Sequence, residues 1–402
     1  MPNAPRFSDW FTYFPDDYRW SAALALVLGS APYGGAELGE VDAVGRRLRG
    51  CVGDDEAWFE AWREMAGRLG ELSERSQKAG HRLTSAGEAL RACSYYQIGE
   101  RFRLPKDRSA LEAYESSLRC FERFAACVDW PRLERVEVPY EGGSLPGYLV
   151  TDPARGVAPS PAVVFFDGLD VTKELQYLRG ATELVRRGMS CLLLDGPGNG
   201  ESIRMRNLPL RADYEKAGSA ALDYLSARPE VDSERVGVMA ISLGGYYATR
   251  CASMDDRFRA CVAWGAIWDY HATWERRISQ DFQTSLSVAG EHIAWVMGKS
   301  SVAEALVALE PFRLADVAPR MRCPFLLLHG TEDEQVPLAD ARALFEAVGS
   351  QDKTLELFDP STGGATHCQT DRLSLATTTF ADWLSERLVS RGPVPGAQQA
   401  GA

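Results

Sequence analysis

Apolar residues recur at intervals of three and four, between charged residues, throughout the first third of the chain. This spacing predicts amphipathic helices. It is found in five segments, residues 17–29, 41–50, 54–78, 82–104 and 108–128. Residues 54–78 are too few for the sustained heptads of a coiled coil, so a hairpin of two long helices is the simpler interpretation. Because almost no strand pattern interrupts these segments, residues 1–130 are predicted to form an all-helical domain.

The pattern changes after residue 130. Alternating apolar and polar residues over 133–140 and 145–150, joined by Gly142 and Gly143, predict an antiparallel hairpin. Short, wholly apolar runs then alternate with helical stretches, and they cover residues 162–166, 190–194, 236–239, 260–264 and 325–328. Strands that are buried on both faces have this composition, and their alternation with helices indicates a parallel sheet covered on both sides. Residues 131–390 are therefore predicted to form a doubly wound, mostly parallel α/β domain.

Two segments depart from this alternation. Residues from about 265 to 315 form a mostly helical insert that is rich in aromatic residues, and inserts of this kind often cover the carboxyl ends of the strands, where sites lie. Aromatic residues at such spacing more often pack than bind a ligand. Residues 391–402 are rich in Gly, Pro, Ala and Gln and are predicted to be a disordered tail.

Composition and charge narrow the classes of function. The chain has 402 residues, 44 basic and 56 acidic, and its net charge of −12 without a run of Lys or Arg argues against a nucleic-acid partner. No basic flank precedes an apolar core at the N-terminus, and no apolar stretch is long enough to span a bilayer, so we expect a soluble, cytoplasmic protein without a membrane partner. Nine scattered cysteines without a C-x-x-C pair favour reduced thiols, and no metal site is predicted.

One turn carries a signal for catalysis. Residues 236–245, Val-Gly-Val-Met-Ala-Ile-Ser-Leu-Gly-Gly, predict a buried strand that ends in a tight turn with Ser242 at its apex. A nucleophilic serine is presented on such a strained turn, which needs the small residues Gly244 and Gly245 around it. Ala240 stands where the pattern G-x-S-x-G has its first glycine, which is a modest intrusion. The alternative is an ordinary turn with a capping serine, so the assignment depends on partners elsewhere in the chain.

The expected order of partners is Ser, Asp, His, each after a later strand. Asp333 meets this expectation in the loop that follows the strand at 325–328. Glu332 and Glu334 are competing candidates for the acid. The Val-Pro that follows the loop favours Asp333 as the group that orients the base of Ser242.

The histidine that fits best is His367. It lies in a glycine-rich loop after the predicted strand at 354–358 and before a terminal helix, whereas the other four histidines lie on helical segments or at a strand end. We therefore predict that His367 takes the proton from Ser242 and that Asp333 holds the imidazole in the required tautomer.

Backbone donors and a glycine-rich turn complete the predicted site. The N–H groups of Leu243, after the serine, and of Leu169, in the loop after the strand at 162–166, are the expected oxyanion donors, with Gly168 allowing close approach. The segment 195–202, Asp-Gly-Pro-Gly-Asn-Gly-Glu-Ser, does not satisfy G-x-G-x-x-G and follows the wrong strand for a first βα turn. We therefore predict a structural turn there and no dinucleotide cofactor.

Four motifs together resemble those of α/β-hydrolases: residues 195–202, Ala-Ile-Ser-Leu-Gly-Gly at 240–245, His-Gly-Thr-Glu-Asp at 329–333 and Gly-Ala-Thr-His at 364–367. The helical region and Phe-Phe-Asp-Gly-Leu-Asp-Val-Thr-Lys-Glu at 165–174 are similar to a narrower group. It contains the fermentation-respiration-switch-like proteins, the 2,6-dihydroxypseudooxynicotine hydrolases and the fungal yellowish-green pigment polyketide hydrolases. This resemblance implies an α/β-hydrolase fold, a helical lid, a homodimer and cleavage of C–C bonds beside ketones.

The leading hypothesis is a serine hydrolase of a small-molecule carbonyl compound, by C–C bond hydrolysis of a diketone or polyketide-like substrate or by ester or amide hydrolysis. A carbon leaving group requires a proton, and Asp269, Tyr270 and Glu275 at the start of the insert are candidates for an auxiliary acid or a substrate contact. Helix capping and surface charge are the alternative roles for these residues. An acyltransferase or cyclase with the same triad, and a non-catalytic hydrolase-like binding protein, are the alternative functions.

Overall fold

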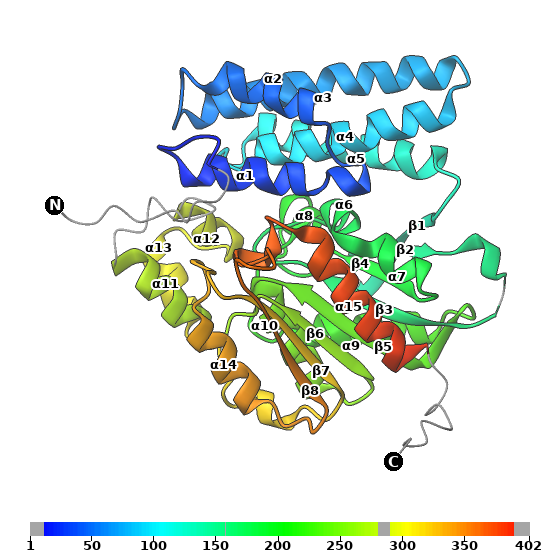
Figure 1. Ribbon diagram of the computed structural model, residues 1–402, viewed down its shortest axis with the longest axis vertical. Helices are drawn as coiled ribbons and strands as arrows, with labels where there is room; N and C mark the ends of the chain where they lie inside the picture. The colour runs from blue at the N-terminus through cyan, green and yellow to red at the C-terminus, as the bar shows by residue number, and fades with distance from the viewer. Residues whose placement is uncertain (1–11, 157, 280–289, 390–402) are drawn as a thin grey trace, which may run out of the picture.

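The computed structural model describes residues 12–156, 158–279 and 290–389. Within them, a layer of helices precedes the sheet in the chain and lies along one side of it (Figure 1). Its helices are α1 (Tyr18–Gly29), α2 (Leu38–Leu48), α3 (Asp55–Lys78), α4 (Arg82–Glu100) and α5 (Arg108–Cys127). We call α1 to α5 the helical layer. The predicted tail at 391–402 and part of the predicted insert, residues 280–289, lie outside the described residues.

Local sequence explains where these helices begin and how they pair. The carboxylates of Asp17, Asp54 and Asp107 accept backbone N–H groups of the first turns of α1, α3 and α5, which satisfies donors that have no partner inside the helix. Helices α3 and α4 form the expected hairpin. Ser73 and Ser85 join them, because each hydroxyl donates to the backbone oxygen of the other residue at 2.9 and 2.8 Å.

The described chain contains one mixed sheet in the order β1-β2-β4-β3-β5-β6-β7-β8. Its strands are β1 (Arg132–Tyr140), β2 (Gly143–Thr151), β3 (Ser160–Phe166), β4 (Ser190–Leu194), β5 (Val231–Ile241), β6 (Ala260–Trp264), β7 (Phe325–Gly330) and β8 (Lys353–Phe358). Strands β1 and β2 form the predicted antiparallel hairpin, β2 pairs antiparallel with β4, and all later pairs are parallel. The predicted α/β-hydrolase architecture is confirmed.

Helices cover both faces of this sheet (Figure 1). They are α6 (Lys173–Gln176), the π-helical turn η3 (Tyr177–Ala181), α7 (Thr182–Arg186), α8 (Gly200–Arg204), α9 (Glu215–Ser226), α10 (Leu243–Met254), α11 (Tyr270–Ser279), α12 (Glu291–Val296), α13 (Val302–Leu309), α14 (Leu338–Ala347) and α15 (Leu373–Leu388). The described part of the insert is helical, in α11, α12 and α13. No helix in the described ranges combines the length and the apolar composition needed to cross a bilayer.

Alternate side chains of the buried strands enter two different cores. In β3, Val163 and Phe165 join the core under α7 and α15, whereas Ala162, Val164 and Phe166 join the core under α9 and α10. This division follows from the two-residue period of a strand.

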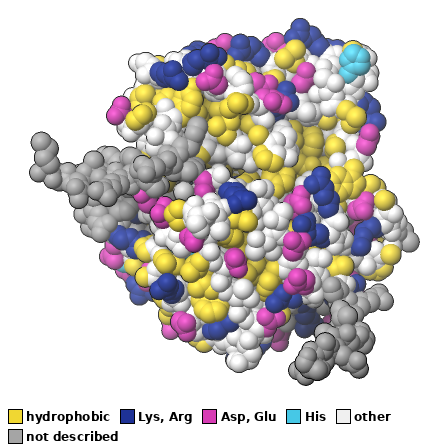
Figure 2. Space-filling view, in the orientation of Figure 1, with side chains coloured by type: hydrophobic (Ala, Val, Ile, Leu, Met, Phe, Trp, Pro, Cys, Tyr) yellow, Lys and Arg dark blue, Asp and Glu magenta, His cyan; other side chains and the backbone are white. Residues whose placement is uncertain are grey.

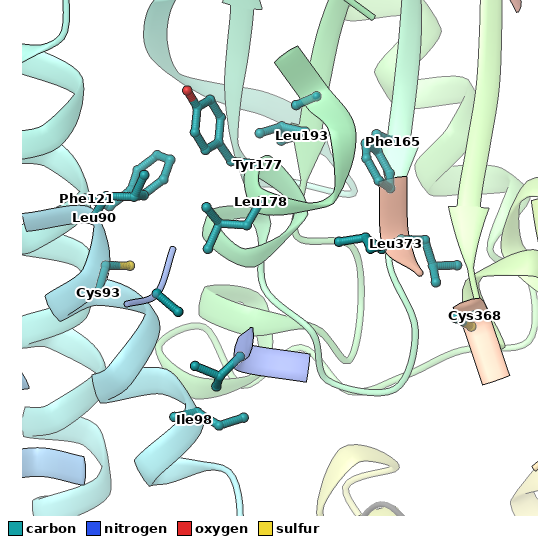
Figure 3. Packing of buried hydrophobic residues seen from close by; sticks show 14 of the residues in the cluster. Leu90, Cys93, Ile98, Phe121, Phe165, Tyr177, Leu178, Leu193, Cys368 and Leu373 are labelled. Carbon is teal, nitrogen blue, oxygen red and sulfur yellow. The ribbon is translucent and has the colours of Figure 1, made fainter. Parts of the chain in front are cut away.

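The first of these cores continues into the helical layer. Figure 3 shows Leu90 and Phe121 of the helical layer facing Tyr177 and Leu178 of the sheet domain. The ring centroid of Phe121 lies 4.8 Å from that of Tyr148 in β2 and 5.8 Å from that of Tyr177. The helical layer and the sheet therefore share one apolar core.

On the outer surface, acidic and basic side chains are interspersed over the face shown in Figure 2.

Candidate active site

Ser242 occupies a strained turn between β5 and α10. Its backbone has φ 59° and ψ −123°, a conformation that is unfavourable for a residue with a side chain. A Cβ on Gly244 would lie 2.7 Å from the backbone oxygen of Asp167, and a Cβ on Gly245 would lie 2.5 Å from Cα of Ala266. Glycine is therefore required at both positions, because the backbones of Asp167 and Ala266 leave no room for a side chain.

The methyl group of Ala240 fits this turn. It points toward Gly244, where an added Cβ would lie 2.8 Å from it. The absence of a side chain at Gly244 thus makes room for alanine at the position where the pattern has its first glycine.

The structure brings Ser242, His367 and Asp333 together from three separate loops. Nε2 of His367 lies 2.8 Å from Oγ of Ser242, and its Nδ1 lies 2.6 Å from Oδ2 of Asp333. The other oxygen of Asp333, Oδ1, accepts the N–H groups of Gln335 and Val336, each at 2.8 Å. These bonds fix the carboxylate, which in turn orients the imidazole toward Ser242.

Electrostatics favour a charged pair of His367 and Asp333. Burial lowers the pKa of His367, but the adjacent carboxylate of Asp333 outweighs burial and raises this pKa to about 10. Burial also opposes ionisation of Asp333, yet His367 and backbone donors hold the pKa of this carboxyl below its ordinary value. The arrangement stabilises an imidazolium, which is the species that forms when a histidine accepts a serine proton.

The competing candidates lie elsewhere. Glu332 and Glu334 are exposed, and neither carboxylate bonds to His367 in the described chain. The buried ring of His329 has its Nε2 3.0 Å from the backbone oxygen of Val336. His292 lies 3.3 Å from Oδ2 of Asp170.

The loop after β3 reaches Ser242. A Cβ on Gly168 would lie 2.9 Å from Cβ and 3.4 Å from Oγ of Ser242, so only glycine allows this approach. Leu169 and Leu243, the expected oxyanion donors, both line the pocket in front of Ser242. Leu243 is the first residue of α10, so its N–H is one of the donors that have no partner within the helix.

The helical layer, the insert and the loops around Ser242 and His367 build the walls of this pocket. It encloses about 120 Å³, which is room for a small organic molecule rather than for a single water. Helix α1 contributes Tyr18 and Leu26, and the insert contributes Ile267, Tyr270 and Arg277. Sequence reasoning anticipated Tyr270 but missed the residues of α1. No local signal marks those residues, because their position depends on how the helical layer packs on the sheet.

Arginine side chains on the pocket wall were also missed. Arg101, at the end of α4, and Arg179, in η3, line the pocket beside Asp167. Oδ1 of Asp167 accepts the N–H of Gly168 at 2.6 Å and lies 3.2 Å from Nη1 of Arg179. Burial raises the pKa of Asp167, and Arg179 offsets this effect only in part.

Asp269 and Glu275 do not line the pocket. The carboxylate of Asp269 accepts the N–H of Ala272 at 2.9 Å at the start of α11 and lies 3.1 Å from Nε of Arg313. The exposed carboxylate of Glu275 lies 3.5 Å from Nδ1 of His271. The structure therefore gives these acids capping and surface positions, and we assign neither a role in the reaction.

The turn at 195–202 is held by a buried carboxylate. Asp195 accepts the backbone N–H groups of Lys173 and Glu201 at 2.7 and 2.9 Å, and Nζ of Lys173 lies 2.9 Å from its Oδ2. A Cβ on Gly200, whose φ is +44°, would collide with this carboxylate at 2.2 Å. Gly200 thus makes room for Asp195, whereas Gly196 and Gly198 make room for Tyr214 and Leu210. In the described ranges, no group of three His, Cys, Asp or Glu side chains is arranged to hold a metal ion.

Comparison with known proteins gives consistent matches. The profile of the family described as "Esterase FrsA-like" matches residues 57–343. The chain is 30% identical to hydrolase acrC of Aspergillus aculeatus, over 96% of this chain and 100% of the relative. It is 31% identical to the 2,6-dihydropseudooxynicotine hydrolase of Paenarthrobacter nicotinovorans, over 87% of this chain and 89% of the relative. The crystal structure of the 2,6-dihydroxy-pseudo-oxynicotine hydrolase matches with a TM-score of 0.76 and 26% identity, over 90% of this chain and 96% of that one.

Proposed function

This chain belongs to the FrsA-like esterase family, a group of α/β-hydrolases, and on that premise we propose that it is a serine hydrolase with Ser242 as its nucleophile. Hydrolysis is the activity in the names of its relatives. The observation that carries the proposal is the continuous chain of contacts from Ser242 through His367 to Asp333, at 2.8 and 2.6 Å. Both separations are hydrogen-bond distances, so a proton can pass from the serine to the imidazole without a rearrangement.

In the proposed reaction, Oγ of Ser242 attacks a carbonyl carbon while Nε2 of His367 takes the hydroxyl proton. The oxyanion of the tetrahedral intermediate accepts hydrogen bonds from the N–H groups of Leu243 and Leu169. The intermediate collapses to an acyl-enzyme, and His367 gives its proton to the leaving group. Water then attacks the acyl-enzyme, with His367 as its base, to release a carboxylic acid and restore Ser242.

For the substrate, we propose a small carbonyl compound that is cleaved at a C–C bond beside a ketone. The electron pair of that bond leaves on carbon as an enolate, and the proton that His367 took from Ser242 ends on this carbon. Two observations support the proposal: the relative named for hydrolysis of 2,6-dihydropseudooxynicotine, and the stabilisation of a protonated His367 by Asp333. An ester would use the same groups, with an alkoxide as the leaving group.

The nucleophile is tested with a fluorophosphonate probe, which forms an adduct with an activated serine. Mass analysis of digested protein should place one adduct on Ser242. The variant Ser242→Ala should lose the adduct and about 10⁶ in turnover. An adduct at another serine, or normal turnover by this variant, would refute the assignment.

The bond is tested with 1,3-diketones and esters that share one acyl group, in water enriched in ¹⁸O. C–C hydrolysis should give a ketone and an acid with one ¹⁸O atom, whereas ester hydrolysis gives an alcohol and the same labelled acid. Transfer of the acyl group to a nucleophile other than water would leave the product unlabelled, which would contradict a hydrolase. Turnover of esters without any cleavage of diketones would contradict the proposed cleavage of a C–C bond.

A further inference from the structure

Arg101 places a positive charge on the wall of the pocket. It lines the same pocket as Ser242 and His367. Its guanidinium group forms no hydrogen bond and no ion pair with any described residue, although its five N–H groups are strong donors. Burial lowers the pKa of Arg101, and the charges of the nearby Asp170, Asp167 and Glu100 offset this effect only in part. A charge held in this way is costly unless an anion joins it.

The nearby carboxylates are engaged with other cations. Nη2 of Arg204 lies 2.8 Å from Glu100 and 2.8 Å from Asp170. Oδ1 of Asp167 pairs with Arg179 at 3.2 Å. These three acids are therefore bonded to Arg204 and Arg179. Oδ2 of Asp167 is buried and has no hydrogen-bond partner in the described ranges. No ion pair joins any of the three acids to Arg101 within those ranges.

The end of α4 holds Arg101 in place. The backbone oxygen of Arg101 accepts a hydrogen bond from Nζ of Lys106 at 3.3 Å. The same Nζ lies 2.9 Å from Oε1 of Glu100. Through Glu100 and Arg204 this helix end is tied to Asp170, one residue beyond the expected oxyanion donor Leu169. The backbone that carries Arg101 is thus held beside the loop of Leu169 before any substrate binds.

A second arginine on the wall adds to this charge. Arg277 of α11 is buried, and its Nε has no hydrogen-bond partner in the part of the chain that the structure describes. Its Nη2 lies 3.4 Å from a backbone oxygen, that of Gln335. Glu332 and Glu334 stand at the rim, exposed, and no ion pair joins them to these arginines within the described ranges. The interior of the pocket is therefore suited to an anion.

We propose that Arg101 binds an anionic oxygen of the substrate, in the first instance a carboxylate, while Ser242 attacks a carbonyl group of the same molecule. A planar guanidinium binds a carboxylate through two parallel hydrogen bonds, which gives both affinity and orientation. This inference rests on the proposed function and adds the class of substrate: a carbonyl compound that also carries an acidic oxygen. It makes the helical layer a source of specificity.

The test compares two substrates that differ in one charge, 4-nitrophenyl hydrogen adipate and its methyl ester. Arg101→Gln should lower kcat/KM for the anionic substrate by about ten- to hundred-fold, mostly through KM, because it removes charge-assisted hydrogen bonds. It should change kcat/KM for the methyl ester by less than about three-fold. Arg101→Lys should restore part of the loss, and Arg108→Gln, at an exposed arginine outside the pocket, should change neither value. An equal loss for both substrates, or no loss for either, overturns the proposal.

Protection from the fluorophosphonate probe gives a second readout that requires no turnover. Adipate should slow the labelling of wild-type Ser242, and Arg101→Gln should need at least ten times more adipate for the same effect, whereas dimethyl adipate should not distinguish the two proteins. If adipate protects both proteins equally or neither, Arg101 binds no carboxylate. Absence of labelling in the wild type without adipate is the separate outcome that defeats the proposed function.

Thermal unfolding distinguishes binding from a structural role. Because the guanidinium has no partner in the described chain, Arg101→Gln should leave Tm unchanged or raise it. A marked fall in Tm would show that Arg101 serves the fold and would count against the proposal.

Discussion

Gly168 faces Ser242 so closely that an added Cβ would lie 2.9 Å from Cβ of Ser242 and 3.0 Å from the backbone oxygen of Ile241. The loop after β3 and the turn after β5 are thus in contact through a residue without a side chain. This contact places Leu169 beside the serine.

Gly168→Ala should therefore impair catalysis more than folding. The methyl group has to displace the loop that carries Leu169, and loss of one oxyanion donor lowers kcat by about 10²–10³. Steady-state kinetics should show this fall in kcat with a smaller change in KM. The matched control is Gly39→Ala in α2, where an added Cβ meets nothing within 4 Å, and normal kcat is expected. A Gly168→Ala enzyme with normal kcat would contradict the oxyanion assignment.

Asp333→Asn should slow turnover by about 10⁴ and shift its pH dependence. In the proposed mechanism His367 acts as the base in its neutral form, so activity should fall as the pH falls through its pKa. Asp333 raises this pKa, so removal of its charge should lower the pKa and move the acidic limb of kcat/KM to lower pH. Glu334→Gln, which removes an exposed carboxylate that does not bond to His367, should leave the limb in place. An unchanged limb in Asp333→Asn would exclude Asp333 as the partner of the base.

Lys173→Met should destabilise the fold strongly. Nζ of Lys173 lies within 2.8 to 3.1 Å of carboxylate oxygens of Glu174, Asp195 and Glu201, and its side chain is fully buried. Removal of a buried charge that pairs with carboxylates typically lowers the free energy of unfolding by about 3–5 kcal/mol. Urea unfolding measures the loss. Lys216→Met, at a lysine with a half-exposed surface ion pair, should leave the urea midpoint nearly unchanged.

His292 should make the stability of the fold depend on pH. Burial lowers the pKa of His292 to about 4, although Asp170 opposes this effect. An unfolded histidine titrates near 6.5, so between about pH 6.5 and pH 4 the unfolded chain binds a proton that the folded chain does not. The stabilisation of the fold by neutral His292 is therefore present above about pH 6.5 and is lost as the pH falls toward about 4.

From pH 7 to pH 5 the wild type should lose about 2 kcal/mol more unfolding free energy than His292→Gln. Urea unfolding of both proteins at the two pH values measures this difference. Parallel losses in the two proteins would show that His292 accepts a proton in the folded state.

The sequence predicted those parts of the site that depend on order along the chain. A buried strand, a tight turn and a helix must follow one another around Ser242, and parallel strands bring the loops with Asp333 and His367 to one edge of the sheet. The pattern could not predict what lies across the pocket. Arg101 reaches it only because α4 and α5 pack on Tyr177 and Tyr148 through side chains such as Phe121.

In the insert, too, the sequence could not predict which residues face the pocket. From the sequence, Asp269, Tyr270 and Glu275 are all candidates for an auxiliary acid or a substrate contact. In a helix with 3.6 residues per turn, two residues five positions apart point about 140° away from each other. Tyr270 points into the pocket, so Glu275, five residues later, points to solvent. The sequence alone does not reveal which side of the helix faces the sheet.

The core that Phe121 shares with Tyr148 and Tyr177 has a consequence for engineering and for the divergence of relatives. Segments α1 to α5 cannot be exchanged as an independent module, because the receiving sheet domain must present a matching apolar surface on β2 and η3. A chimera that takes these helices from one hydrolase and the sheet from another should stay folded only if that surface is transplanted with them. New substrate preferences would then arise by substitutions on the pocket side of α1 and α4, with the buried contacts left intact.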